Sequence, residues 1–441
     1  MTCSNNLALG NAQDTNFAPR VGFAYRFTPK LVARGGYGIF YGALGSIGYG
    51  PDIGNNYPFL YDLYYFNPDA AHPIAFPNGS LGTLETGLSA INFSPSQVDA
   101  EGLSLAGRQY NYITPYFEDY NIAIQWEVSP NQTFAVSYVG NQGHHQGEFA
   151  GTNNPTEILP PGLNPQNYVP FQDFARGSSY EATDGNTYYN ALQPSFERRF
   201  SSGFTFLANY TWSHCRSDWR SPALSTTSGY RAPDLPGFGI KADYEYCDAD
   251  VPNLFHFSGL YTLPIGNGQH FLHDSKGVVN QVIGGWKINW IMTLEDGMPF
   301  NIGCPIGTTA DFGCNALLVP GQNIYGGPHN VNQWINPAAF ANPAVATSVG
   351  QTNFAPLGGA STQAHGPGEH RLDFSLFKEF PVSESKRFEF RAEFFNLTNT
   401  PWFANPAYTD FTNTATFGQI TSLRDGANDP REIQLALKFY F

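Results

Sequence analysis

The chain has 441 residues, with 22 Lys and Arg against 36 Asp and Glu, and a formal net charge of −14 at pH 7. This acidic balance argues against a nucleic-acid partner, which requires basic stripes. Charged residues make up only 13% of the chain, about half the usual share of a soluble domain. The chain contains no run of about 18 apolar residues, so the sequence predicts no membrane-spanning helix.

Alternation of apolar and polar residues predicts about eleven strands, because successive side chains of a strand point to opposite faces. Each is about 9–11 residues long, which suits a tilted strand that crosses a bilayer. A helical connection is expected over 266–284 and a strand extension over 417–423. The predicted strands are 19–27, 31–41, 118–128, 132–140, 187–200, 204–213, 255–265, 285–296, 370–380, 387–397 and 431–441.

The last predicted strand shows the alternation most clearly. Its apolar residues share one face, namely Ile433, Leu435, Leu437, Phe439 and Phe441. A soluble sandwich strand can alternate in the same way, but it would leave the terminal ring at a frayed end. In an outer-membrane barrel the apolar face contacts lipid, the polar face a wet lumen, and aromatic residues lie at the interfaces. Phe439 and Phe441 are therefore the candidate signature for membrane assembly.

The connections between the strands alternate between short and long. Tight turns at 28–30, 129–131 and 201–203 alternate with long stretches at 42–117, 141–186 and 214–254. Short periplasmic turns and long extracellular loops are typical of outer-membrane barrels, whereas sandwiches and propellers have no reason to separate loop lengths in this way. The sequence therefore predicts an all-β, antiparallel transmembrane barrel portion. Because complete single-chain barrels have an even strand number, we expect an odd count to mark the C-terminal part of a longer protein.

Several motifs resemble the barrel region of Oar-like TonB-dependent outer-membrane receptors. They are FAPRVGFAY at 17–25, ARGGYGIFY at 33–41, YNALQ at 189–193, GGW at 284–286, FRAEFFNLTN at 390–399 and DPREIQ at 429–434. The resemblance implies a 22-stranded barrel filled by an N-terminal plug that contacts TonB, preceded in some relatives by a carboxypeptidase-regulatory-like domain. Residues 1–441 would then form a partial barrel domain that lacks the signal peptide, the plug and the N-terminal barrel strands.

Four of the five cysteines fall in predicted extracellular loops, an oxidising setting in which disulfides persist. We expect Cys215 to pair with Cys247 and Cys304 with Cys314, each pair closing a loop. Free or differently paired thiols are the alternative, and Cys3 is left over.

The candidate metal residues have simpler explanations. Asp243, Glu245, Asp248 and Asp250 bunch in one loop and could hold calcium, but their spacing is not that of an EF-hand, and a hydrated acidic loop is favoured. A solvated pair is likewise favoured for His144 and His145 over a transition-metal site. No zinc-ligand spacing occurs, so no metal or cofactor is expected.

Two further groups of residues are candidates for contact with a ligand or a plug. Exposed rings in segment 56–66 could stack on sugars or peptides, although packing of loops over the barrel mouth is favoured. These ligand-loop candidates are Tyr57, Tyr61, Tyr64 and Tyr65. Inward charges on the late strands could pair with one another, dock a plug or face lumen water, and they are Arg371, Asp373, Glu389, Arg391, Glu393 and Lys438.

The chain contains no nucleophile elbow, zinc-protease motif or P-loop, so the sequence predicts no enzyme. The predicted function is energised uptake of a bulky nutrient (an oligosaccharide, a peptide or a siderophore) across the outer membrane. Its expected partners are outer-membrane lipid, the TonB complex through the plug, and the outer-membrane assembly machinery. Two alternatives stay open: an adhesin or structural barrel with binding loops, and a secreted β-sandwich that binds carbohydrate.

Overall fold

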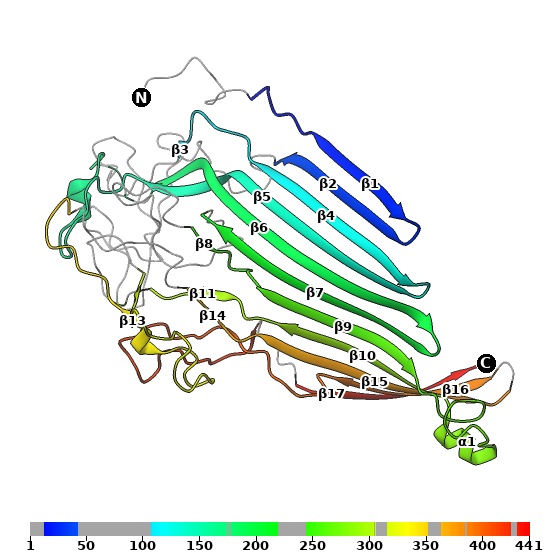
Figure 1. Ribbon diagram of the computed structural model, residues 1–441. Coiled ribbons are helices and arrows are strands. Elements are labelled where there is room, and N and C mark those ends of the chain that lie inside the picture. Colours follow the sequence, from blue (N-terminus) through cyan, green and yellow to red (C-terminus); the bar gives the residue numbers. More distant parts are fainter. Residues whose placement is uncertain are drawn as a thin grey trace, which may run out of the picture.

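The computed structural model describes residues 13–42, 107–172, 174, 176, 178–218, 244–303, 305, 315–351, 363–383, 386–424 and 430–441. One sheet dominates it, and each of its eleven long strands pairs antiparallel with the next long strand along the chain (Figure 1). These strands are β1 (Arg20–Thr28), β2 (Leu31–Tyr41), β4 (Tyr116–Ser129), β5 (Gln132–Thr152), β6 (Ser178–Ser201), β7 (Phe204–Ser217), β9 (Asn253–Thr262), β10 (Trp286–Glu295), β15 (Glu369–Pro381), β16 (Arg387–Phe395) and β17 (Glu432–Tyr440). The predicted fold class and strand count are thus confirmed.

The register of the sheet separates an apolar face from a polar face. Ile124 of β4 lies opposite Val136 of β5, and Phe394 of β16 lies opposite Ile433 of β17. A shift of one residue in any pair would turn that strand's side chains to the other face, so the matched register makes the apolar face continuous across the sheet. Many of its side chains are exposed, including Ile122, Ile124, Trp126, Trp212, Ile433, Leu435 and Leu437. Such a large exposed apolar surface marks a membrane or protein interface.

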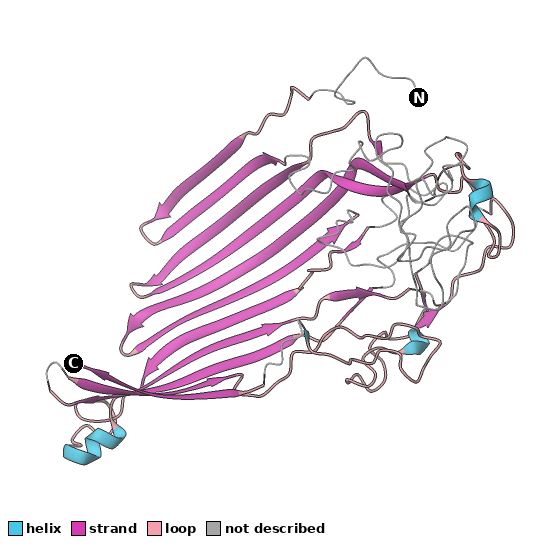
Figure 2. Cartoon of the chain, turned by 180° about the vertical axis from the view of Figure 1, so that it is seen from behind, coloured by secondary structure: helices cyan, strands magenta, loops and turns pink. Residues whose placement is uncertain are grey.

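The two ends of the sheet differ, as the spacing of the predicted strands implies. Tight turns and the C-terminus lie at one end, here called the turn end, and the long connections lie at the other, the loop end (Figures 1 and 2). The connection between β9 and β10 is the longest at the turn end among those described and contains α1 (Gly277–Ile283). This helix falls within the predicted helical stretch 266–284.

Three strands reach further toward the loop end than the sequence predicts. β5 continues to Thr152 and β6 begins at Ser178, so both strands extend into the predicted loop 141–186, and β7 continues to Ser217. The predicted boundaries were wrong because a backbone ladder needs no apolar alternation once both of its faces are polar. The ladder between β5 and β6 is interrupted near His145, which has φ of 55°, and such bulges bend a strand without ending its pairing.

Two of the long connections pack on one another and form a buried core. The described parts of 296–368 and 396–431, here called the loop pack, contain the sheets β11 (Pro299–Asn301) with β14 (Gln363–His365) and β12 (Leu317–Leu318) with β13 (Phe340–Ala341). The short helix η6 (Pro337–Ala339) belongs to the same pack. Its core residues are Ile302, Ala316, Ile335, Ala339, Phe340, Ala364, Phe411 and Phe417.

The predicted strand extension at 417–423 was wrong, because Phe417 is buried in this core and only an isolated bridge joins Phe403 to Leu423. The minor elements at the loop end are β3 (Gly107–Arg108), β8 (Glu245–Tyr246) and η3 (Pro165–Tyr168). No second large sheet covers the apolar face in the part of the chain that the structure describes. The β-sandwich alternative, which needs those rows turned into a dry interior, therefore does not fit.

Candidate functional site

The polar face of the sheet carries a cavity of about 800 Å³. Side chains from six strands line it, including Glu197 of β6, Asn289 of β10, Asp373 of β15, and Arg391 and Glu393 of β16. Charged groups of both signs therefore face the same space. Such a wall holds water and can bind polar groups of either charge.

Charges on this face pair with one another along the strands. Arg371 Nε lies 3.1 Å from Asp373 Oδ1, and Arg391 Nε donates to a carboxylate oxygen of Glu389. Lys438 lies directly opposite Glu389 in the register of β16 and β17. Of the three outcomes expected for the inward charges, mutual pairing is the one that the described residues display. Because these groups are part-exposed, each pair adds little to stability.

An asparagine turn closes the loop end of β16 and explains the segment 390–399 singled out in the sequence. Asn396 is buried, with φ of 48°, and its amide side chain both accepts from the Thr400 N–H and donates to the Thr400 carbonyl, each at 3.0 Å. Its own N–H donates to Asp373 Oδ1 at 2.8 Å. The Arg431 N–H donates to Asn399 Oδ1 at 2.9 Å. Asparagine tolerates positive φ better than most residues, so this turn links β16 to the start of β17.

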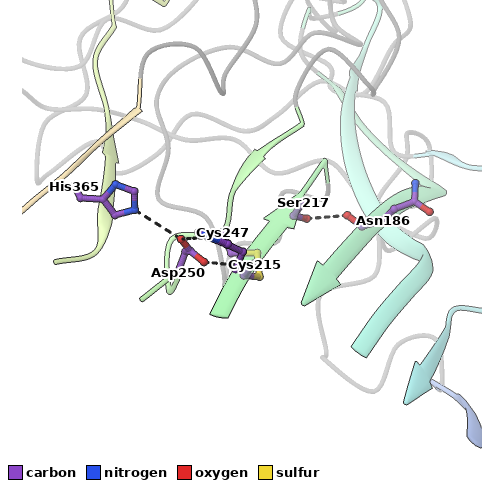
Figure 3. The surroundings of a disulfide bond; sticks show 7 residues. Asn186, Cys215, Ser217, Cys247, Asp250 and His365 are labelled. Carbon is purple, nitrogen blue, oxygen red and sulfur yellow. Dashed lines mark hydrogen bonds and ion pairs between the residues drawn. A yellow bond between two sulfur atoms is a disulfide. The ribbon is translucent and has the colours of Figure 1, made fainter. Parts of the chain in front are cut away.

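A disulfide lies at the loop end of β7 (Figure 3). Cys215 and Cys247 are joined with their Cα atoms 5.4 Å apart, which is the pairing that the loop spacing favoured. Cys215 is a residue of β7 itself rather than of a loop, because that strand runs four residues beyond its predicted end. The Cys247 N–H donates to the Cys215 carbonyl at 3.1 Å, so the covalent link and the backbone bond hold the same two segments together.

Asp250 connects this disulfide to the loop pack. It is 1% exposed, and its Oδ1 accepts from the Cys215 N–H at 2.6 Å. Its Oδ2 lies 3.7 Å from Nε2 of His365 in β14 and 3.9 Å from Nδ1 of His214 (Figure 3 shows His365). Each imidazole attracts the carboxylate when the imidazole is protonated. The carboxylate thus ties a strand of the main sheet to a distant connection.

An aromatic recess and a buried carboxylate flank the disulfide. A recess of about 320 Å³ is lined by aromatic rings, among them Phe117, Tyr189 and Tyr246. Beside β6, the buried Asp218 carboxylate accepts from the Asn186 N–H at 2.6 Å. Burial raises the pKa of Asp218 above its ordinary value, although the hydrogen bonds from Asn186 act in the opposite direction. The recess has the size and lining to accept a single ring.

The three calcium candidates that the structure describes do not form one cluster. Asp250 is engaged as above, Glu245 is buried in β8, Asp248 lines the recess, and Asp243 lies outside the described residues. No group of three or more His, Cys, Asp and Glu could hold a metal ion in the described part of the chain. Outside that part also lie Cys3, Cys304, Cys314, Tyr57, Tyr61, Tyr64 and Tyr65.

The remaining candidates lie at the two ends of the sheet. His144 Nδ1 is 3.4 Å from Asn186 Oδ1 and His145 Nδ1 is 3.0 Å from the Thr183 carbonyl, so both rings contact amide groups. At the turn end, the Phe439 ring lies 5.9 Å from that of the exposed Phe441. The described helices include none that is long and apolar enough to cross a membrane.

The model of the family described as "Outer membrane beta barrel domain" matches residues 3–434. The chain belongs to that family. This barrel domain is therefore located in the outer membrane, where its apolar face contacts lipid, its turn end faces the periplasm and its loop end faces outward. No curated protein matches the chain.

Solved structures that are similar to the barrel domain include three outer-membrane proteins. The outer membrane transporter YddB from Escherichia coli has a TM-score of 0.44 and 12% identity, covering 93% of this chain and 39% of its own. The ferric-catecholate import receptor Fiu from E. coli has a TM-score of 0.39 and 10% identity, and the match covers 96% of this chain and 34% of Fiu. The ferric preacinetobactin receptor BauA from Acinetobacter baumannii has a TM-score of 0.40 and 11% identity, and the match covers 96% of this chain and 36% of BauA. The chain therefore spans about two fifths or less of the length of these proteins.

Proposed function

We propose that the chain is the C-terminal barrel portion of an Oar-like TonB-dependent receptor that imports a bulky nutrient. The observation that carries the proposal is the continuous meander of eleven long strands, apolar on one face and lined with paired charges on the other. A barrel's diameter grows with its strand number, and barrels of about 22 strands enclose a lumen wide enough to need a plug. Eleven strands would form about half of such a wall.

The edges of the sheet support the same proposal. Within the described residues, β1 and β17 each pair on one side only. Unpaired strand edges are costly in lipid, where water cannot satisfy the backbone groups. On this proposal residues 1–441 are a partial barrel domain, and further strands, the plug and the TonB contact belong to other parts of the protein.

Each part of the described structure has a role in this proposal. The loop pack and the segments around the disulfide would capture an oligosaccharide, a peptide or a siderophore at the cell surface. The charged wall would then face the plug and the passing nutrient. The plug would rearrange when TonB pulls on it, and no residue of the barrel performs bond chemistry.

One observation favours a second candidate, an outer-membrane adhesin or structural barrel. The loop pack has its own buried core, with Ile302, Ile335 and Phe417 each at most 1% exposed. A rigid outer platform of this kind would suit binding of a partner without transport.

An uptake experiment separates the two candidates. Cells with and without the intact gene, each with and without TonB, are given isotope-labelled oligosaccharides, peptides or iron–siderophore complexes. The receptor proposal expects accumulation of one class that requires both the gene and TonB. Surface binding that is independent of TonB, with no accumulation of any class, would favour the adhesin.

A further inference from the structure

The connection between β9 and β10 differs from the tight turns beside it. Residues 263–285 contain α1 and present several large apolar side chains that are more than half exposed. These residues, here called the α1 patch, are Phe271, Leu272, Val278, Val279 and Val282. An exposed apolar patch normally marks a contact surface. The α1 patch at the periplasmic end of the sheet therefore calls for a partner.

Hydrogen bonds attach this connection to the lipid-facing side of the sheet. Trp286 of β10 and Lys378 of β15 lie opposite one another on the apolar face. The Trp286 Nε1–H donates to the Val282 carbonyl at 3.0 Å, and Lys378 Nζ donates to the Gly284 carbonyl. Lys378 is only 2% exposed, and its Nζ lies 4.9 Å from the centre of the Trp286 ring. The connection therefore shields a lysine that would otherwise face lipid.

The neighbouring residues on the polar face make no such contact with the connection. Lys287 and Glu379, each next in sequence to one of the anchoring residues, pair with one another at 3.1 Å. Figures 1 and 2 show α1 projecting from the turn end of the sheet, beyond the ends of β9 and β10. The contacts thus place the connection next to the lipid-facing surface rather than across the lumen.

The helix itself has one apolar side and one side bound to its own connection. Val278, Val279 and Val282 are spaced so that they share one side of the helix. Asn280 lies on the other side, where its Oδ1 accepts from the Asn267 N–H at 2.7 Å. The apolar side therefore points away from the connection and is exposed.

We propose that the β9–β10 connection is an interfacial anchor whose α1 patch inserts into the periplasmic leaflet of the outer membrane. Its occupant is phospholipid at the boundary between head groups and acyl chains, where short amphipathic helices with a polar side commonly lie. The segment 263–285 contains one acidic residue, Asp274, and one lysine, Lys276. Because these charges balance, burial of apolar surface drives the insertion, and added salt leaves it unchanged.

Photolabelling of the full-length protein in phosphatidylethanolamine–phosphatidylglycerol vesicles tests the proposal. One phospholipid probe carries a diazirine high on its acyl chain and a second carries it near the chain end, and adducts are mapped by mass spectrometry. The high probe is expected to label 271–282 and Leu437, whereas the deep probe labels Leu435 and spares 271–282. Neither probe should label Asn131, in the tight turn between β4 and β5.

A matched pair of variants sharpens the test. Val279→Asn should lower the adducts in 271–282 at least about threefold, because an amide resists insertion, whereas Gln281→Asn should leave them unchanged. The Leu437 adduct reports that each variant still folds into the bilayer. Absence of adducts in 271–282 of the unsubstituted protein, with Leu437 labelled, would overturn the proposal. Labelling of 271–282 by the high probe that is no stronger than that of Asn131 would overturn it as well.

Discussion

Placing one arginine on either face of β17 tests the assignment of the faces. Leu435 lies near the middle of this strand, on the apolar face, and is 68% exposed in the absence of lipid. An arginine at the midplane of a bilayer costs about 2–4 kcal/mol when it faces lipid. Since about 1.4 kcal/mol is a tenfold change, we expect Leu435→Arg to lower the folding equilibrium constant roughly 30-fold to 700-fold.

The neighbouring residue provides the matched control. Gln434 lies on the polar face, directly opposite Glu393 of β16. Gln434→Arg therefore introduces the same side chain beside a carboxylate and water, and we expect a change within about 1 kcal/mol. Both variants are unfolded with guanidinium chloride from lipid vesicles, and tryptophan fluorescence gives the free energy of unfolding. Equal losses in the two variants, or a larger loss for Gln434→Arg, would refute the assignment of the faces.

Three further variants probe the loop end by the same measurement. Serine at both Cys215 and Cys247, whose sequence separation is 32, should cost about 3–4 kcal/mol of chain entropy, and dithiothreitol should lower the unsubstituted protein to the same value. Asn396→Ala removes the two hydrogen bonds with Thr400, a longer one from Thr398, and an asparagine at positive φ, and should cost about 1–3 kcal/mol. Burial raises the pKa of Asp218, so the folded state favours its neutral form and loses stability as the pH rises through that raised value. Asp218→Asn should remove this loss, and its advantage over the unsubstituted protein should grow above about pH 4; an advantage that shrinks with pH would contradict the sign.

The sheet was readable from the sequence because one local rule fixes most of it. Each membrane-spanning strand exposes one face to lipid and the other to water, so residues such as Ile433, Leu435 and Leu437 must alternate with polar ones. Tight turns at 28–30, 129–131 and 201–203 then fix neighbours and register. The apolar residues face lipid, so the strands could be predicted without knowing which other residues pack against them.

The loop end was less readable because its contacts are distant in sequence and follow no period. Nothing local marks Phe417 as a core residue, and its burial depends on Ile335 and Phe340 from another connection. The approach of His365 to Asp250 likewise follows from how the loop pack folds. The strand extensions past 140 and 213 could not be predicted from the sequence, because apolar and polar residues no longer alternate once both faces of the strand lie outside the membrane.

A nitroxide scan along β4 tests the central claim most directly. Single labels at each position from 120 to 127, in the protein reconstituted in vesicles, are compared for access to molecular oxygen and to a water-soluble nickel chelate. We expect labels at Tyr120, Ile122, Ile124 and Trp126 to be reached by oxygen, and those at Asn121, Ala123, Gln125 and Glu127 by the chelate. A scan in which the even-numbered positions are shielded from both reagents would contradict a sheet with one face in lipid and the other in water.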